Sequence, residues 1–508
     1  MQIVFNRIHN LKQEVNIVWF KRDLRLLDHE PLMLALNSEV PTLLLYIFEP
    51  MLLNDPHYSE RHFDFIKQSL VNMNEKLAAI GTQLLIIESD ASHAFTTLAS
   101  SLDIKNVFSY QETGLLLTFK RDIKLKEYFK TQKIHWSESV ANGVVRGLKN
   151  RTNWKEHWIA FINKDFDHPN FDNSTLFGIS RIKQLESSFK SVDLNTTKAT
   201  PFQKGGTTTA LKYFEGFLEE RINGYNTHYS KPLTSRNYSS RLSPYLAWGN
   251  LSIRMVAQKA ASFKSQIKNK RNLNSFLSRL RWQAHFIEKF EMEYQMEYRN
   301  VHAAFRSLNK PSNLEVQQAW KEGKTGYPMV DAGMRCLVAT GFVNFRIRAM
   351  LVSFFTHHLW QPWQDASEHM AQQFLDFEPG IHYPQLQMQA GVTGINTVRI
   401  YSPVRNSLDH DPEAVFLKKW LPELAHLPVP YIHEPWEIPA MEAVFQNFEV
   451  GKDYPLPIVD AKLARKHAQD ILYGIKKDAK SKSESRRIVN KHTNPGREIW
   501  PGGGEIRS

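Results

Sequence analysis

Short continuous apolar runs dominate the first 140 residues of the chain. They are rich in β-branched and aromatic side chains and lie at 15–20, 41–50 and 82–89. The more polar stretch 106–112 is a fourth predicted strand, and 133–139 is a possible fifth. Runs of this kind are typical of strands buried on both faces, as in a parallel sheet. The intervening stretches, such as 58–80, have helical periodicity, and this alternation predicts βαβ units. We therefore expect an α/β, Rossmann-like domain with a parallel sheet over residues 14–140.

The hydrophobic pattern changes after residue 140. The segment 141–204 is polar and poor in strand signals, so it is predicted to be an interdomain linker. Over 205–475, apolar residues recur at helical spacing, most clearly in 245–263, 273–292, 331–359 and 365–376. This periodicity predicts an all-helical domain. The last segment, 476–508, carries nine Lys or Arg against four Asp or Glu and is expected to be a basic, flexible tail beyond a short helix.

Composition narrows the class of protein. With 508 residues, 42% of them hydrophobic and 12% aromatic, the chain can bury a large core, so an intrinsically disordered protein is excluded. The single cysteine, Cys336, excludes a disulfide framework and any multi-cysteine zinc or iron–sulfur site. No apolar run reaches the ~18 residues of a membrane span and no secretory signal is recognised, which favours a cytoplasmic protein. The net charge of +12 favours a polyanionic partner.

A cluster of hydroxyl groups beside an arginine precedes one of the predicted helices. The segment reads Ser239, Ser240, Arg241, Leu242 and Ser243. Free backbone N–H groups at a helix start, together with hydroxyls and a cation, suit a phosphate group. An ordinary capped helix without a ligand is the alternative interpretation.

Further motifs occur in order along the chain, at 19–25, 324–335, 345–348, 375–378 and 399–403. Together with 239–247, this ordered set strongly resembles the DNA photolyase/cryptochrome family over roughly residues 15–470. The resemblance implies an N-terminal antenna domain, a linker, and a C-terminal helical domain that binds FAD. It also allows an antenna chromophore (a folate, a deazaflavin or a lumazine), for which no residues are assigned.

The resemblance implies a set of residues for the FAD site. Arg348 and Asp376 match a buried guanidinium–carboxylate pair beside the isoalloxazine, and His382 falls near the position that faces flavin N5. A tyrosine upstream of the phosphate segment lines the site; Tyr225 is the better match and Tyr229 the alternative. The implied set is Tyr225, Ser239, Ser240, Arg241, Leu242, Ser243, Gln283, Arg348, Asp376, Phe377, Glu378 and His382.

The segment around Trp282 resembles the family's helix that lines both flavin and substrate. The implied DNA-contacting residues are Arg279, Trp282, Phe345, Arg346 and Met388. Arg279 stands where the family usually has a glutamate that contacts the lesion, and Ala349 stands where it usually has a methionine. A core position is the alternative for Trp282 and Phe286. These departures leave open the lesion type, cyclobutane dimer or (6-4) photoproduct.

The tryptophans that relay electrons to the flavin in the family are altered here. Trp363 matches the middle member and is the residue assigned to electron transfer, whereas the proximal position falls near Leu386 or Met388 and the distal one near Lys310. Core packing is the alternative role for the tryptophans of this region. A substitute relay could be formed by the nearby aromatic residues Trp360, Trp363 and Tyr383.

The activity that the resemblance implies is that of a deoxyribodipyrimidine photo-lyase, a carbon–carbon lyase that splits UV-induced pyrimidine dimers. The electron comes from photoexcited, reduced FAD. Photolyases flip the damaged bases out of the duplex, which requires a basic rim and an aromatic pocket. The expected partner is DNA with pyrimidine dimers, bound by a monomer without a metal or a membrane. A cryptochrome-like blue-light photoreceptor that keeps FAD but signals is the first alternative, and a basic helical nucleic-acid binder without flavin is the second.

Overall fold

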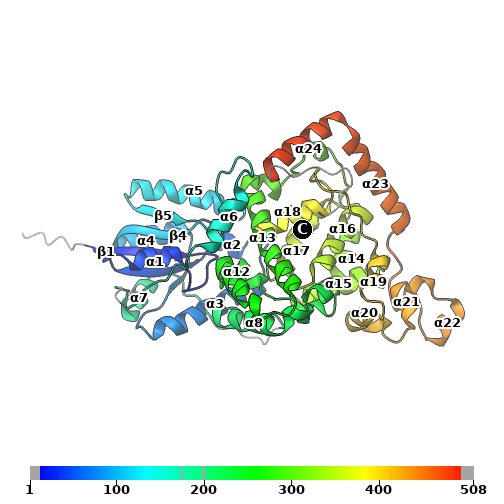
Figure 1. The fold of residues 1–508 in the computed structure, drawn as a ribbon, viewed down its shortest axis with the longest axis horizontal. Coiled ribbons are helices and arrows are strands. Elements are labelled where there is room, and N and C mark those ends of the chain that lie inside the picture. The colour runs from blue at the N-terminus through cyan, green and yellow to red at the C-terminus, as the bar shows by residue number, and fades with distance from the viewer. Residues whose placement is uncertain (1–11, 173–174, 197–200, 494–508) are drawn as a thin grey trace, which may run out of the picture.

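The computed structural model describes residues 12–172, 175–196 and 201–493. An α/β domain lies at one end of the molecule and a helical domain at the other, packed side by side (Figure 1). This arrangement confirms the predicted fold class.

Parallel strands form the sheet of the N-terminal domain: β1 (Gln13–Phe20), β2 (Thr42–Phe48), β3 (Leu85–Glu88), β4 (Leu102–Tyr110) and β5 (His135–Ser139). Their order is β3-β2-β1-β4-β5. Val18 of β1 lies in register between Leu44 of β2 and Phe108 of β4. Every predicted strand is confirmed, with ends that differ by a few residues. The order reverses between β1 and β4, and such a switch point is where α/β sheets usually bind ligands.

Helices cover both faces of the sheet, which explains why residues 15–20 of β1 and all of β2 are buried. Ile17 and Trp19 point to one face and pack with Phe95 and Phe129. Val18 and its neighbours on the opposite face share a core with helices of the C-terminal domain. The helices of the N-terminal domain are α1 (Glu30–Leu36), α2 (Pro50–Leu53), α3 (Glu60–Ala78), α4 (Ala91–Ser101) and α5 (Leu116–Thr131).

The segment 141–204, predicted as a linker, is largely folded onto the domains that it joins. It contains α6 (Trp154–Asn163) and α7 (Ile179–Glu186). Trp154 and Trp158 are buried, and residues on either side of α7 form isolated bridges to β2 and β3. Trp154, Trp158 and Ile162 recur at i, i+4 and i+8 and form the buried face of α6. The segment thus contains helices packed on its neighbours, and its assignment as an interdomain linker stays a prediction.

The C-terminal domain is helical, as predicted. Its main helices are α8 (Thr207–Glu219), α12 (Ile253–Ser262), α13 (Lys270–Met292), α14 (Leu314–Glu322), α15 (Pro328–Thr340), α16 (Phe345–Ser353), α17 (Trp363–Gln373), α18 (Pro379–Gln389), α19 (Pro403–His410) and α23 (Ala461–Lys477). Shorter ones are α9 (Tyr225–His228), α10 (Ser235–Tyr238), α11 (Ser243–Ala247), α20 (Val415–Trp420), α21 (Val429–His433) and α22 (Ala440–Phe445). A π-helical turn, η5 (Phe354–His358), extends α16, and 3-10 turns are η1 (Arg221–Gly224), η2 (Phe263–Ser265), η3 (Tyr294–Glu297), η4 (Ala303–Phe305), η6 (Pro422–Leu424) and η7 (Pro435–Glu437). Within the described ranges, no helix is long and apolar enough to cross a membrane.

The periodic stretch 331–359 is two helices rather than one. Gly341 adopts a left-handed φ of 67° and ends α15, because that backbone conformation suits glycine. The side chain of Asn344 then accepts a hydrogen bond from the Ile347 N–H and caps α16. The predicted helix 245–263 is likewise divided, into α11 and α12, by Gly249 at a φ of 72°.

The expected flexible tail is helical as far as residue 492. Helix α24 (Ala479–His492) packs against α23 and η4, and its Ile488 is fully buried in the core of the helical domain. Lys491 pairs with Glu293 at 2.7 Å. The buried side chains of α24 are Ser481, Ile488 and His492. The expectation allowed a short helix, and the flexible tail expected beyond it falls on residues 494–508, which lie outside the described residues.

A buried ion cluster connects the two domains and the segment between them. Arg254 of α12 contacts Asp28, which follows β1, and Asp167, which follows α6, the latter at 2.5 Å. The hydroxyl of Ser252 also donates to Asp28. All three charged side chains are at most 7% exposed, so water cannot replace a missing partner.

We predict that Arg254→Met lowers the free energy of unfolding by about 3–5 kcal/mol, because it leaves two buried carboxylates without their cation. Denaturant unfolding measures the change. The matched control is Lys259→Met on the same helix, whose partly exposed pair with Glu215 is expected to contribute below about 1 kcal/mol. Equal losses in the two variants would contradict the proposed role of the cluster.

Candidate functional site

The predicted phosphate segment lies in the turn between α10 and α11. Arg241 has a left-handed φ of 60°, which is uncommon for a residue with a side chain and often marks a functional site. Its guanidinium lies over the Phe342 ring at 3.7 Å, and burial lowers the pKa of Arg241 to about 9. Helix α11 contains only five residues, so its dipole is weak, and arginine side chains rather than the helix start supply most of the positive potential.

Several hydrogen-bond donors in this turn lack a partner within the described chain. They are Nη1 of Arg236, Oγ of Ser239 and Nη1 of Arg241, all buried. Arg236 is close enough to contribute, after burial, to lowering the pKa of Arg241. Buried polar groups are normally paired, and an unpaired one costs about 1–3 kcal/mol. Guanidinium and hydroxyl donors that remain open fit the phosphates of a dinucleotide such as FAD.

Arg348 and Asp376 form the ion pair that the resemblance implies. Nη2 of Arg348 donates to Oδ1 of Asp376 at 2.6 Å, and the guanidinium lies over the Phe374 ring at 3.5 Å. The two side chains are 18% and 12% exposed. The contact with the ring and the carboxylate holds the guanidinium in one orientation.

Phe377 and Glu378 face the N-terminal domain, unlike Asp376. Arg22, just after β1, donates to the Phe377 carbonyl at 2.5 Å and pairs with Glu378 at 3.3 Å. The Phe377 ring stacks on His57 with ring centres 5.7 Å apart. The structure therefore places these residues in the domain interface, where burial raises the pKa of Glu378.

A line of contacts runs from Arg279 and Trp282 on α13 to Arg346 on α16, where Phe345 is the preceding residue. The Arg279 guanidinium lies 5.4 Å from the Trp282 ring and 5.8 Å from the Tyr229 ring. Tyr229 stacks on Tyr225, and next to it Ser230 accepts a 3.5 Å hydrogen bond from Arg346. We call Tyr229, Arg279, Trp282, Phe345 and Arg346 the arginine–aromatic rim.

The side chains of the rim are largely open to solvent. Trp282 is 40% exposed and Phe345 is 46% exposed, so the alternative of a core position is wrong for Trp282. It is right for Phe286, which is buried. Both tyrosine candidates, Tyr225 and Tyr229, lie beside Arg279.

For the remaining predicted residues, no described side-chain contact explains a role at the site. Gln283 is half-buried on α13, and Met388 is half-buried near the end of α18. Leu242 is buried, and Ser243 is exposed at the start of α11. Ser240 caps locally, since its hydroxyl accepts from the Leu242 N–H at 3.4 Å.

His382 is buried and uncharged. Its Nε2 bonds to the Ser367 carbonyl at 3.0 Å, so this nitrogen carries the hydrogen, and burial holds the pKa of His382 well below its usual value. The next residue, Tyr383, contacts Trp363 with ring centres 6.2 Å apart. Trp360, by contrast, packs against Lys310 and His467.

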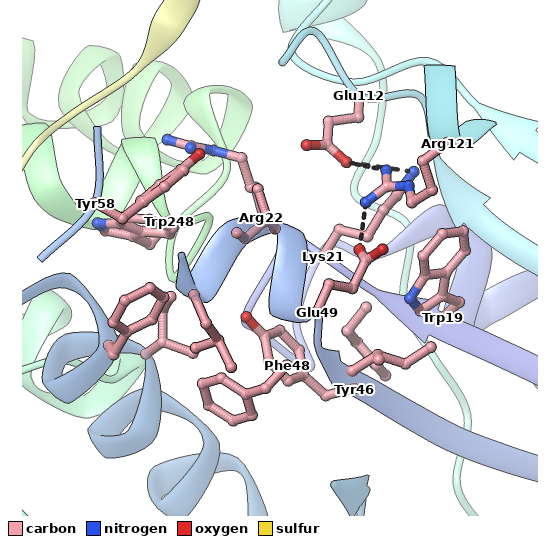
Figure 2. A pocket seen from close by; sticks show the side chains of 16 residues that line it. Trp19, Lys21, Arg22, Tyr46, Phe48, Glu49, Tyr58, Glu112, Arg121 and Trp248 are labelled. Atoms are coloured by element: carbon pink, nitrogen blue, oxygen red, sulfur yellow. Dashed lines mark hydrogen bonds and ion pairs between the residues drawn. The ribbon is translucent and has the colours of Figure 1, made fainter. Parts of the chain in front are cut away.

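A pocket opens at the switch point of the sheet, between the carboxyl ends of β1, β2 and β4 (Figure 2). Arg121 bridges Glu49 at 2.5 Å and Glu112 at 2.7 Å. Burial raises the pKa of Glu49 to about 7. Burial also acts to raise the pKa of Glu112, but the positive charges of Arg121 and Lys21 outweigh it and lower that pKa to about 2. Aromatic lining residues are Trp19, Phe20, Tyr46, Phe48, Tyr58, Phe63 and Trp248.

This pocket is too small for the chromophores that the resemblance allows. Its volume is about 40 Å³, which is room for roughly two to four water molecules. A folate, deazaflavin or lumazine does not fit with the side chains so arranged. In the described part of the chain, no group of three His, Cys, Asp or Glu residues is placed to hold a metal ion.

Sequence reasoning missed Arg22, His57 and Arg236. Arg236 lies three positions before Ser239, and its nearness to the hydroxyl cluster was a usable signal. Arg22 and His57 come from loops of the N-terminal domain, and no local pattern connects them with Phe377.

Comparisons with known proteins agree with this geometry. Residues 276–473 match the FAD binding domain of DNA photolyase, and residues 16–152 match DNA photolyase. A cryptochrome DASH of Gloeobacter violaceus is 26% identical, covering 87% of this chain and 93% of its own length. A deoxyribodipyrimidine photo-lyase of Vibrio cholerae is 28% identical, covering 89% and 97%.

Solved structures share the fold. A bacterial class III photolyase from Agrobacterium tumefaciens has a TM-score of 0.77 at 24% identity, covering 93% of this chain and all of its own. A Synechocystis cryptochrome has a TM-score of 0.78 at 22% identity, covering 90% and 99%. The family models agree with the unpaired donors near Arg241 and with the Arg348–Asp376 pair: the chain belongs to the FAD-binding DNA photolyase/cryptochrome family.

Proposed function

We infer that the chain is a light-dependent DNA repair enzyme that splits UV-induced pyrimidine dimers. The observation that carries this proposal is the arginine–aromatic rim, in which exposed Trp282 and Phe345 accompany Arg279 and Arg346. Exposed aromatic rings stack on unpaired bases, and arginines bind the phosphates beside them. This combination suits a lesion flipped out of a duplex.

The chain's own residues would hold and orient FAD. Arg236, Ser239 and Arg241 would take the phosphates with their open donors, and Arg348 with Asp376 would place fixed charges beside the ring system. Neutral His382 would offer Nδ1 without adding a charge. Bound FAD supplies the light-driven electron transfer.

A cryptochrome-like photoreceptor is the second candidate. It is favoured by Arg279 at the position where the family usually has a glutamate for the lesion, and by Leu386 near a position of the tryptophan relay. Relatives of both kinds are similar to this chain, including the cryptochrome DASH and the photo-lyase above.

Removing the carboxylate of Asp376 tests the flavin site. We predict that the flavin content of purified Asp376→Ala is lower than that of the wild type by about tenfold or more. The substitution leaves the Arg348 cation unpaired in a largely buried site. The absorbance ratio of flavin to protein measures this, with circular dichroism to verify folding. Asp409→Ala, at an exposed surface pair, is the control. Stoichiometric flavin in Asp376→Ala would contradict the assignment.

Illumination of lesion-bearing DNA tests the activity. Under photoreducing conditions, the purified protein is expected to remove either cyclobutane dimers or (6-4) photoproducts from duplexes of defined sequence, measured by chromatography of the digested DNA. A dark sample is the control. If neither lesion is lost although the protein carries flavin, the repair proposal is wrong and the photoreceptor is the better reading.

Truncation of the rim tests how DNA is bound. Trp282→Ala is expected to weaken binding to dimer-containing DNA by roughly 5- to 150-fold, because one base–aromatic stack contributes about 1–3 kcal/mol. Fluorescence anisotropy measures the affinity. Lys452→Ala removes an exposed cation elsewhere on the helical domain and should leave the affinity nearly unchanged. An equal effect of the two substitutions would rule out a specific role of the rim.

A further inference from the structure

We propose that Tyr383 is a redox-active tyrosine that passes its phenolic proton to His57 when it gives up an electron. Asp55 is the positioning residue that orients His57. The inference rests on the proposed flavin photochemistry and names the residues that carry the electron and the proton.

The hydrogen bonds define the direction of proton transfer. Oδ1 of Asp55 lies 2.7 Å from Nδ1 of His57 and also accepts the backbone N–H of His57 at 2.9 Å. A carboxylate accepts, so Nδ1 carries the ring hydrogen and Nε2 presents its lone pair. Nε2 lies 2.5 Å from the Tyr383 hydroxyl, which is therefore the donor. The arrangement places a base on the phenol and a carboxylate behind the base.

Tyr383, His57 and Asp55 form a triad that is shielded from water. Tyr383 is 1% exposed and His57 is 8% exposed, and Phe377 stacks on the imidazole. Burial raises the pKa of Tyr383 well above its usual value, so the phenol stays protonated at rest. An oxidised phenol is a strong acid, and in this enclosure His57 is the base within hydrogen-bond distance. The other titratable groups that face the triad include Tyr58, Glu297, Tyr298, Glu368 and His382.

Tyr383 also lies where the family's tryptophan relay is interrupted. It precedes Leu386 by three positions on α18, so the two residues share a face of the helix. Its ring is 6.2 Å from Trp363, the match to the middle relay member, and 5.2 Å from His382, the residue implied at the flavin. Tyr383 thus connects the implied cofactor position with Trp363, which Leu386 cannot do because it has no aromatic ring.

The step balances in electrons and protons. Tyr383 gives one electron to a photoexcited, oxidised flavin, and its O–H bond breaks as the proton moves to Nε2 of His57. The resulting imidazolium is stabilised by Asp55. A thiolate in solution then returns one electron to Tyr383 through Trp363, and the proton moves back from His57. The net result is one electron transferred from thiolate to flavin.

The experiment compares flavin-loaded wild-type protein with Tyr383→Phe, His57→Gln and Tyr327→Phe. Tyr327 is the matched control, because its buried hydroxyl donates to the Val459 carbonyl at 2.6 Å, and a carbonyl is no base. Flavin content is measured first. Samples frozen under illumination are then examined by electron paramagnetic resonance, and photoreduction rates with added thiol are compared in H₂O and D₂O.

We expect a tyrosyl radical and slower photoreduction in D₂O for the wild type and for Tyr327→Phe. Tyr383→Phe should lose the radical, and His57→Gln should slow photoreduction on the order of 100-fold, the usual effect of removing a positioned base. Flavin-loaded His57→Gln with an unchanged radical yield and rate would overturn the inference, as would a wild type without a tyrosyl radical or without an isotope effect. A wild type that binds no flavin would overturn the proposed function as well, whereas repair without a tyrosyl radical would overturn the inference alone.

Discussion

The packing of the helical domain onto one face of the parallel sheet is the constraint on which the rest of the structure depends. Val18 of β1 belongs to the same core as α8 and α12, and Arg254 is held at this boundary by two buried carboxylates. A shift between the domains would expose apolar area and separate charges that water does not reach. The loops that carry Arg22 and His57 are therefore held against Phe377 and α18.

The candidate FAD site contains an ion pair with both partners in the chain, and hydrogen-bond donors that have no partner within the described chain. The Arg348–Asp376 pair is complete within the chain, so it can orient a ligand without being rearranged. Arg236, Ser239 and Arg241 instead keep buried donors without a partner, and this reduces the stability of the protein alone. A bound phosphate would accept hydrogen bonds from these donors and so remove that cost. The free energy gained in this way would strengthen the binding of a dinucleotide.

Much of the architecture could be predicted because buried apolar residues recur with the period of the helix or strand that they belong to. Strands such as 15–20 are buried at every position since both sheet faces are covered. The division of 331–359 at Gly341 was overlooked, although a glycine followed by an asparagine cap is a readable signal. The helix α6 within 141–204 was also overlooked, although Trp154, Trp158 and Ile162 recur at the helical spacing i, i+4 and i+8.

The sequence by itself determined the two-domain class through local periodicity, and its ordered short segments carried the family resemblance. The Arg348–Asp376 pair was implied by that resemblance, and the structure shows its hydrogen bond. Only the tertiary structure decided that Glu378 faces Arg22 and that Tyr383 meets His57, which is 326 positions away in the chain. Hydrogen bonding and burial depend on distances in space. Those distances are set by how the sheet and the helices share one core, and no local pattern of residues encodes them.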